Sequence, residues 1–383
     1  MKRFSTLLGF ELKKIARGRV AVASLALCAA LLFALTLISE MVARPEGRGA
    51  RTLTGRAVDD GFVAEVADAA ARAGGLTAVP PESPYCQAAR WMNRMLGNSV
   101  SIADVSGDVA PDMLTAGALY AARDGVMETL YDTFGLRQDE RDWWAARERR
   151  IERPYVWADS RAAGAIKADS SAVTALMCLL MGVCLAGTYA DERRRRTDAM
   201  VLCAPHGRGV LWKVKFCAGE IWALAVGTAL LAAAALPHIL LNGLRGLDGA
   251  WQLVTPFSAY PHGIGTMLLI YLALYGLICL LTGAAVMALS VWLQNAMAVT
   301  GIVGAMVTAD LFISVPARLR VLSQMRYLTP IQIMINSAMT DPRLILLFGR
   351  YVTPLQAAAM LYAAATMALY WLTGIGYKRL RAG

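Results

Sequence analysis

The histidines and cysteines are the side chains of this sequence with the most reactive chemistry, and their spacing supports no reactive site. His206, His238 and His262 lie far apart and have no metal-ligating neighbours along the chain. The seven cysteines include no Cys-x-x-Cys pair, and Cys86 is the one cysteine of a long hydrophilic segment. Neither His-Glu-x-x-His nor Gly-x-Ser-x-Gly is present. We therefore predict no catalytic residue and no metal site, and we expect His238 and His262 to have interfacial roles.

The chain also lacks the phosphate-binding loop Gly-x-x-x-x-Gly-Lys-Ser/Thr. In proteins that contain this loop, its backbone N–H groups and its lysine hold the phosphates of ATP. Its absence predicts that this chain does not bind ATP in that way and holds no cofactor of its own.

Charged residues inside apolar stretches are the remaining candidates for function, because such charges are costly in a membrane and are often functional. Asp310 is the one charged residue of Ala296–Pro316. We expect it either to bond to a neighbouring helix or water, or to line a translocation path. For Glu40 and Glu220, which lie near the ends of their apolar stretches, we expect carboxylates that snorkel or are paired locally.

These charges interrupt a chain of 383 residues in which 57% are hydrophobic, compared with about 45–50% in soluble domains. Several apolar stretches reach the length of about 20 residues that crosses a bilayer as a helix. Because a backbone in lipid must satisfy its own hydrogen bonds, we predict an all-α integral membrane protein with six transmembrane helices. The predicted helices are Val20–Val42, Ser171–Ala190, Phe216–Leu241, Gly265–Leu289, Ala296–Pro316 and Leu355–Tyr377.

The net charge of +10 is interpreted as a sign of membrane topology, and no nucleic-acid partner is predicted from it. Lysine and arginine are concentrated in Met1–Arg19, in the loop 191–215 and from Lys378 to the C-terminus. Short cytoplasmic loops are enriched in these residues, so both termini and the loop are predicted to be cytoplasmic. The five arginines of Ala317–Thr353 are an exception to this rule.

Residues 43–169, between the first two predicted membrane helices, are predicted to form a small external domain that is mainly helical. A long loop can cross the membrane largely regardless of its charge, and a structureless loop of this length would be unusual. Asp59 and Asp60 precede apolar residues at helical spacing, and Gly74 and Gly75 follow them as a stop signal. Two further segments, from Gly117 to Gly135 and from Arg137 to Pro154, have the same helical pattern.

Residues 1–19 have the pattern of an amphipathic helix that lies in the membrane surface. Phe4, Leu7, Leu8, Leu12 and Ile15 fall on one face, and basic residues that include Lys13 and Lys14 fall on the other. Glu11 falls in the middle of the apolar face. It is expected either to be partly exposed near the helix edge or to pair with an arginine of the neighbouring basic loop.

The loop 191–215 connects the second and third predicted membrane helices. Its run of four arginines, Arg193–Arg196, is typical of an anchor at lipid headgroups. The residues that follow favour a short amphipathic helix, Thr197–Ala204, which Thr197 can cap and Pro205 can stop. Such a helix would present Asp198 and its neighbours to a soluble partner beneath the membrane.

The same loop resembles the loop after the second helix of ABC-2 type transporter permeases. In that family a Glu, a Gly-Thr, a Leu-x-x-Pro and a downstream Lys form a cytoplasmic coupling helix. The corresponding residues here are Glu192, Thr197, Leu202, Pro205, Arg208 and Lys213. Arg196 departs from the family pattern, in which a Gly usually precedes the Thr. The resemblance extends to the N-terminal surface helix, the large external domain and the six helices in 20–42 and 170–383.

The resemblance implies the membrane subunit of an exporter in the cytoplasmic membrane of a bacterium. A second permease subunit, identical or different, would pair with it in the lipid bilayer. Separate ABC ATPase subunits, which bind ATP and Mg, would dock on the coupling helices. Two other classes remain open, a secondary transporter and a non-transporting scaffold or sensor built around the external domain. A secondary transporter would be expected to show inverted repeats and broken helices.

Overall fold

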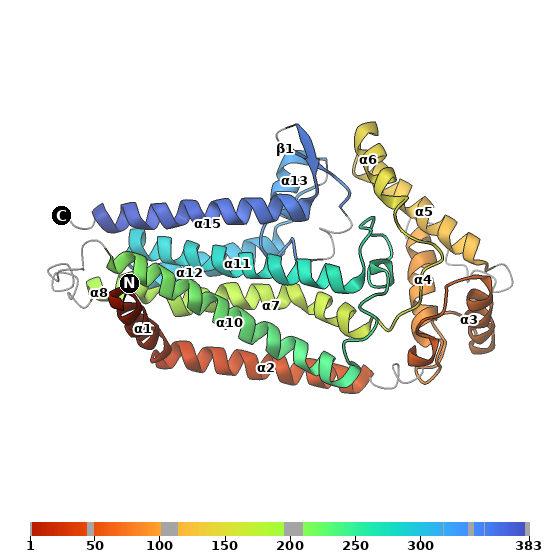
Figure 1. Cartoon of the computed structure of the whole chain (residues 1–383), viewed down its shortest axis with the longest axis horizontal. Coiled ribbons are helices and arrows are strands. Elements are labelled where there is room, and N and C mark those ends of the chain that lie inside the picture. Colours follow the sequence, from red (N-terminus) through yellow and green to blue (C-terminus); the bar gives the residue numbers. More distant parts are fainter. Residues whose placement is uncertain are drawn as a thin grey trace.

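The computed structural model describes residues 2–43, 50–100, 114–194, 210–316, 318–335, 341–347 and 349–379. Within these residues the chain is mostly helical. Long helices lie side by side, and a group of shorter helices, α3–α6, sits at one end of them (Figure 1). The helices at the two chain ends, α1 and α15, both have their chain termini at the opposite end (Figure 1). We call these two ends of the bundle the domain end and the terminal end.

Five described helices are long and apolar enough to cross a membrane, which confirms the prediction of a helical membrane protein. They are α2 Arg19–Ala43, α7 Arg161–Leu185, α10 Leu211–Asn242, α11 Ile264–Leu293 and α15 Pro354–Arg379. Helix α7 begins at Arg161, ten residues before the predicted start at Ser171. The prediction was late because the first turns of α7 contain polar residues, which lower the local hydropathy. Hydropathy therefore located the apolar part of α7 and missed its polar start.

The apolar helix α12 is shorter than predicted, since it spans Ala296–Phe312 and does not reach Pro316. Its 17 residues measure about 26 Å at about 1.5 Å per residue, less than the ~30 Å of a bilayer core. The backbone is already extended at Ile313. A proline disfavours helical geometry in the residue before it, so the helix ends ahead of Val315.

Helices α7, α10 and α11 form the centre of the bundle. Helix α2 packs on α10 and α7, α12 packs on α7 and α11, and α15 packs on α11. The α10–α11 contact is close at two glycines: a Cβ atom at Gly219 would meet the Met287 Sδ at 2.2 Å, and one at Gly227 would meet the Cys279 Sγ at 2.3 Å. Small residues allow membrane helices to approach in this way, so these two positions set the spacing of α10 and α11.

The N-terminal helix α1 spans Lys2–Ala16 and contacts α10 and α2 at the terminal end. Its predicted apolar residues are half-buried, whereas Lys13 and Lys14 are exposed. Glu11 is buried, which contradicts the expectation of partial exposure, and it forms a salt bridge with Lys14 of the same helix, with 3.9 Å between Oε2 and Nζ. The carboxylate therefore lies on the packed face of α1. The alternative expectation, a pair with an arginine of the basic loop, concerns side chains outside those that the structure describes.

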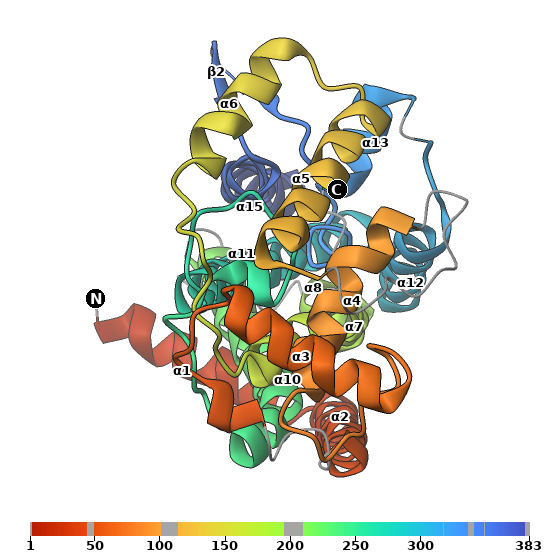
Figure 2. The same cartoon turned by 90° about the vertical axis from the view of Figure 1, so that its right-hand side faces the viewer.

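The domain between α2 and α7, which we call the helical domain, begins with the short helix η2 Ala50–Leu53. It continues with α3 Asp60–Ala73, α4 Cys86–Val100, α5 Ala116–Thr133 and α6 Gln138–Glu148, which cover the ends of the long helices in Figure 2. The predicted signals of α3 are confirmed: the Asp59 side chain accepts a hydrogen bond from the Phe62 N–H, and Gly74 is left-handed with φ of 87°. Helix α4, which the sequence analysis did not predict, supplies the buried core residues Trp91 and Met92.

Arg123 of α5 attaches the helical domain to the loop between α10 and α11. Its side chain is fully buried, and its guanidinium donates to the Pro256 carbonyl at 2.8 Å and the Ser258 carbonyl at 3.0 Å. It also donates to the carboxylate of Glu148 at the end of α6. Burial would lower the pKa of Arg123, but Tyr155 and the Glu148 carboxylate hold that pKa above its ordinary value. Arg123 therefore remains charged and ties three segments together.

The connection from α12 to α15 contains structure that was not predicted. Helix α13 Arg320–Tyr327 is followed by the antiparallel strands β1 Ile345–Leu347 and β2 Arg350–Val352, in which Leu347 pairs with Arg350. The left-handed Gly349, with φ of 76°, lies in the turn. This hairpin is a small exception to the predicted all-α fold.

Candidate functional site: ionisable groups between the membrane helices

A histidine lies between two carboxylates near the domain end of the bundle. His238 of α10 places Nδ1 2.7 Å from the Glu40 Oε1 of α2 and Nε2 2.8 Å from the Asp169 Oδ2 of α7. The second Glu40 oxygen accepts from the Asn242 amide at 2.6 Å. The His238 side chain is 4% exposed and that of Glu40 is 13% exposed. This cluster therefore joins three membrane helices through polar contacts.

The geometry of the cluster sets the charge of His238. Ionised carboxylates only accept hydrogen bonds, and an imidazole that donates from both nitrogens is the protonated form. If both carboxylates are ionised, each imidazole nitrogen must donate to one of them, and His238 is then the protonated cation between Glu40 and Asp169. The expectation of a locally paired Glu40 is confirmed, whereas His238 has a buried ionic role that its position near a helix end did not reveal. Asp169 was not singled out in the sequence.

Lys167 of α7, which lies outside this cluster, lines a cavity of about 250 Å³. The side chain is buried, and its Nζ donates to the Thr255 Oγ1 in the α10–α11 loop at 3.0 Å. The other lining residues are mostly apolar side chains of α10 and α11. Lys167 was missed because it precedes the apolar stretch that marked this helix. A lysine about one turn before such a stretch is the signal that could have identified it.

Asp310 lines a different, largely apolar cavity of about 270 Å³ between α7, α11 and α12. Its carboxylate accepts from the Thr329 hydroxyl at 2.6 Å and from the Ile331 N–H at 3.3 Å. The expected partner was a neighbouring helix or water, whereas the partners found here belong to the turn after α13. The position beside a cavity keeps Asp310 a candidate for a translocation path.

Among the described residues, Glu220 of α10 neither snorkels nor has a local partner, contrary to expectation. Both of its carboxylate oxygens are buried and have no hydrogen-bond partner in the part of the chain that the structure describes. A Cβ atom at Gly283 of α11 would lie 3.5 Å from these oxygens. A carboxyl group in such a place is expected to be neutral, because an isolated buried charge is very costly.

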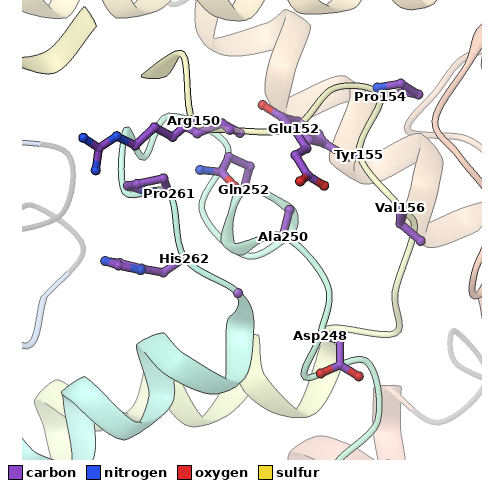
Figure 3. Close-up of a pocket in the computed structure, with 12 residues that line it drawn as sticks. Arg150, Glu152, Pro154, Tyr155, Val156, Asp248, Ala250, Gln252, Pro261 and His262 are labelled. Carbon is purple, nitrogen blue, oxygen red and sulfur yellow. The ribbon is translucent and has the colours of Figure 1, made fainter. Parts of the chain in front are cut away.

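A polar cavity of about 270 Å³ lies where the helical domain meets the α10–α11 loop. Figure 3 shows that its residues come from two facing segments, 150–156 and 248–263. Arg150, Glu152, Asp248 and His262 bring charges of both signs to this cavity. His262 is exposed, and its expected interfacial role stays a prediction.

Three arginines of the α12–α15 connection, Arg320, Arg326 and Arg343, have specific partners. Arg320 donates to the Glu140 carboxylate of α6 at 2.5 Å, and Arg326 donates to the Asp310 carbonyl at 3.3 Å. Arg343 is fully buried and donates to the Asp341 carboxylate at 2.6 Å and to the Ser323 hydroxyl at 2.6 Å. These partners account for three of the five arginines in a segment that is an exception to the positive-inside pattern.

Most of the predicted coupling residues, Thr197, Asp198, Leu202, Pro205 and Arg208, lie outside the described residues. Glu192 belongs to α8 Gly187–Arg194. Lys213 is an exposed residue in the first turn of α10, with its Nζ 5.8 Å from the centre of the Trp212 ring. Helix α8 and the start of α10 both lie at the terminal end (Figure 1). The loop therefore leaves and re-enters the bundle at the end that holds both chain termini.

No group of three His, Cys, Asp or Glu side chains in the described ranges could hold a metal ion. No family model matches the sequence, and neither a curated protein nor a solved structure is significantly similar to it.

Proposed function

We propose that this chain is the membrane-spanning permease subunit of an ABC-2 type exporter in a bacterial cytoplasmic membrane. In this proposal α12 with residues 313–316 completes a layout of six spans. The terminal end is cytoplasmic, and the helical domain is external. A second permease subunit, the same or different, pairs with this one, and separate ATPase subunits with ATP and Mg dock on the loop 191–215.

The observation that carries the proposal is the position of Lys167 and Asp310 beside two cavities between the membrane helices. Ionisable residues inside a membrane bundle are costly and commonly mark a substrate path. A scaffold built around the helical domain would not need them. The choice of the ABC-2 class among transporters rests on the resemblance in loop 191–215.

A secondary transporter is the less favoured class. Its substrate site is typically formed by helices that are broken near mid-membrane. Here α7, α10 and α11 each continue as one described helix over at least 25 residues. Pro237 lies within α10, only five residues before its end at Asn242, and so it is not at mid-membrane.

The orientation can be tested with single cysteines in a cysteine-free background. An Asp68→Cys variant places a thiol on the exposed side of α3, where the native side chain is 67% exposed. We expect a membrane-impermeant maleimide to label it in intact cells. A Lys378→Cys variant at the exposed terminal end is expected to be labelled only after permeabilisation. The reverse pattern would contradict the proposed topology.

The partner can be tested by co-expression with a candidate ABC ATPase encoded beside this chain. We expect the purified chain alone to hydrolyse no ATP, and the pair to co-purify and hydrolyse it. A Glu192→Ala variant is expected to reach the membrane normally but to lose most of the coupled hydrolysis, because Glu192 stands where the helix meets the basic loop. An Arg194→Ala variant is expected to lose less, since neighbouring arginines still anchor the loop. ATP hydrolysis by the chain alone, or greater damage from Arg194→Ala, would refute this account.

A further inference from the structure

The cavity beside Lys167 is lined by successive turns of two helices. Its lining includes residues from Leu231 to Ile239 of α10 and from Leu268 to Tyr275 of α11, at spacings of three or four residues. At about 1.5 Å per residue, these stretches extend for about 10–12 Å along the helix axes. The lining therefore follows α10 and α11 for about that distance.

The cavity carries a cation near the domain end of the bundle. Lys167 reaches Thr255 of the α10–α11 loop there, and that loop lies at the domain end (Figure 1). Tyr271 also lines the cavity, and its buried hydroxyl has no hydrogen-bond partner among the described residues. The remaining lining is almost entirely apolar. One positive group and one hydroxyl on an apolar wall complement a molecule with an anionic head and a hydrocarbon tail.

The volume of the cavity and its opening to the surface of the bundle indicate more closely which class of molecule could bind there. The volume of about 250 Å³ is below the range of about 300–1,000 Å³ that is usual for pockets of drug-sized ligands. It therefore suits one chain better than a ring system or a pair of chains. Two lining residues, Leu244 and Leu272, are 45% and 53% exposed. The cavity thus reaches the outer surface of the bundle, from which a lipid-like molecule can enter.

We propose that this cavity binds a single-chain amphiphile whose anionic headgroup pairs with Lys167 and whose chain lies between α10 and α11. A charge-assisted hydrogen bond in a site with little water supplies affinity for the headgroup. Burial of the chain against apolar side chains supplies the rest. If such a molecule is also the exported substrate, that part of the inference rests on the proposed function, whereas binding to the isolated chain does not.

The test is equilibrium binding of radiolabelled dodecyl phosphate to the purified chain in phosphatidylcholine nanodiscs. We expect saturable binding that unlabelled dodecyltrimethylammonium competes for poorly. A Lys167→Met variant is expected to bind at least about tenfold more weakly, as for the loss of a hydrogen bond to a charged group. A Lys167→Arg variant should keep most of the affinity. An Ala235→Leu variant, which fills the cavity and keeps the charge, should also lose binding.

Two matched controls separate this site from general effects. An Ala285→Leu variant fills the neighbouring Asp310 cavity, and a Lys378→Met variant removes an exposed charge at the terminal end. Both are expected to bind dodecyl phosphate normally, and all variants should elute as the wild type does in gel filtration. Unchanged binding of dodecyl phosphate by correctly folded Lys167→Met and Ala235→Leu variants would overturn the proposal. It would also be overturned if Ala285→Leu lost as much binding affinity as these two variants. If dodecyl phosphate binds as expected but the co-expression test finds no ATPase partner, the binding site stands and only the proposed exporter function fails.

Discussion

A His238→Leu variant is expected to lose about 3–5 kcal/mol of unfolding free energy, one of the largest effects of any single change in this chain. The reason is that Glu40 would keep a buried charge without its cationic partner, and Asp169 would lose its contact with α10. The measurement is unfolding in mixed micelles as the fraction of denaturing detergent increases. A loss below about 1 kcal/mol, the usual value of an exposed ion pair, would show that the cluster is not a buried ionic contact.

The matched control for this prediction is His262→Leu, because His262 is an exposed histidine near the same end of the bundle. Its effect is expected to stay within about 0.5 kcal/mol, as for most surface substitutions. A Glu40→Leu/His238→Leu double variant should lose less stability than the sum of the two single variants, because it leaves no half of that pair buried alone. Strict additivity would argue against direct coupling of these two side chains.

An Arg123→Met variant is expected to detach the helical domain from the bundle, with a loss of about 3–5 kcal/mol in the free energy of docking. The variant leaves the Pro256 carbonyl without its buried donor, the Ser258 carbonyl with only the Gln252 amide, and the Glu148 carboxylate without one of its partners. Detachment can be measured by amide hydrogen exchange, which is expected to become faster in α5, α6 and the α10–α11 loop. The exchange of α2 and α15, which Arg123 does not contact, should stay unchanged.

Arg72→Met is the control for the loss of an arginine in the same domain. Arg72 pairs with Asp68 at 2.5 Å, but the two side chains are 72% and 67% exposed. Such a pair contributes about 0–1 kcal/mol, so the exchange rates should hardly change. If both variants had the same effect, burial of Arg123 would not be what holds the domain in place.

Local signals were sufficient for several elements of the fold. The apolar stretches identified five membrane helices because length and hydropathy act along one segment at a time. Asp59 and Gly74 marked the two ends of α3 because caps depend on neighbouring residues. Where polar residues continue a membrane helix, as in the first turns of α7, the same method began the helix too late.

The short α12 and the hairpin β1–β2 were beyond reach for a different reason. A run such as Ala296–Pro316 is apolar throughout, and hydropathy does not report where its helix stops. The hairpin consists of two strands of three residues each, too short for a clear alternating pattern. It lies against α6 through the contact of Tyr351 with Asp139, and this contact joins residues far apart in the sequence.

Taken by itself, the sequence determined the membrane character of the chain, the helical domain after α2 and the basic loop 191–215. It also marked Glu40 and Asp310 as charges inside apolar stretches. Only the tertiary structure brought Glu40, Asp169 and His238 together from three helices and placed Lys167 beside a cavity. The physical reason is that hydropathy and capping are local properties, whereas the partner of a buried charge depends on which helix faces lie against each other.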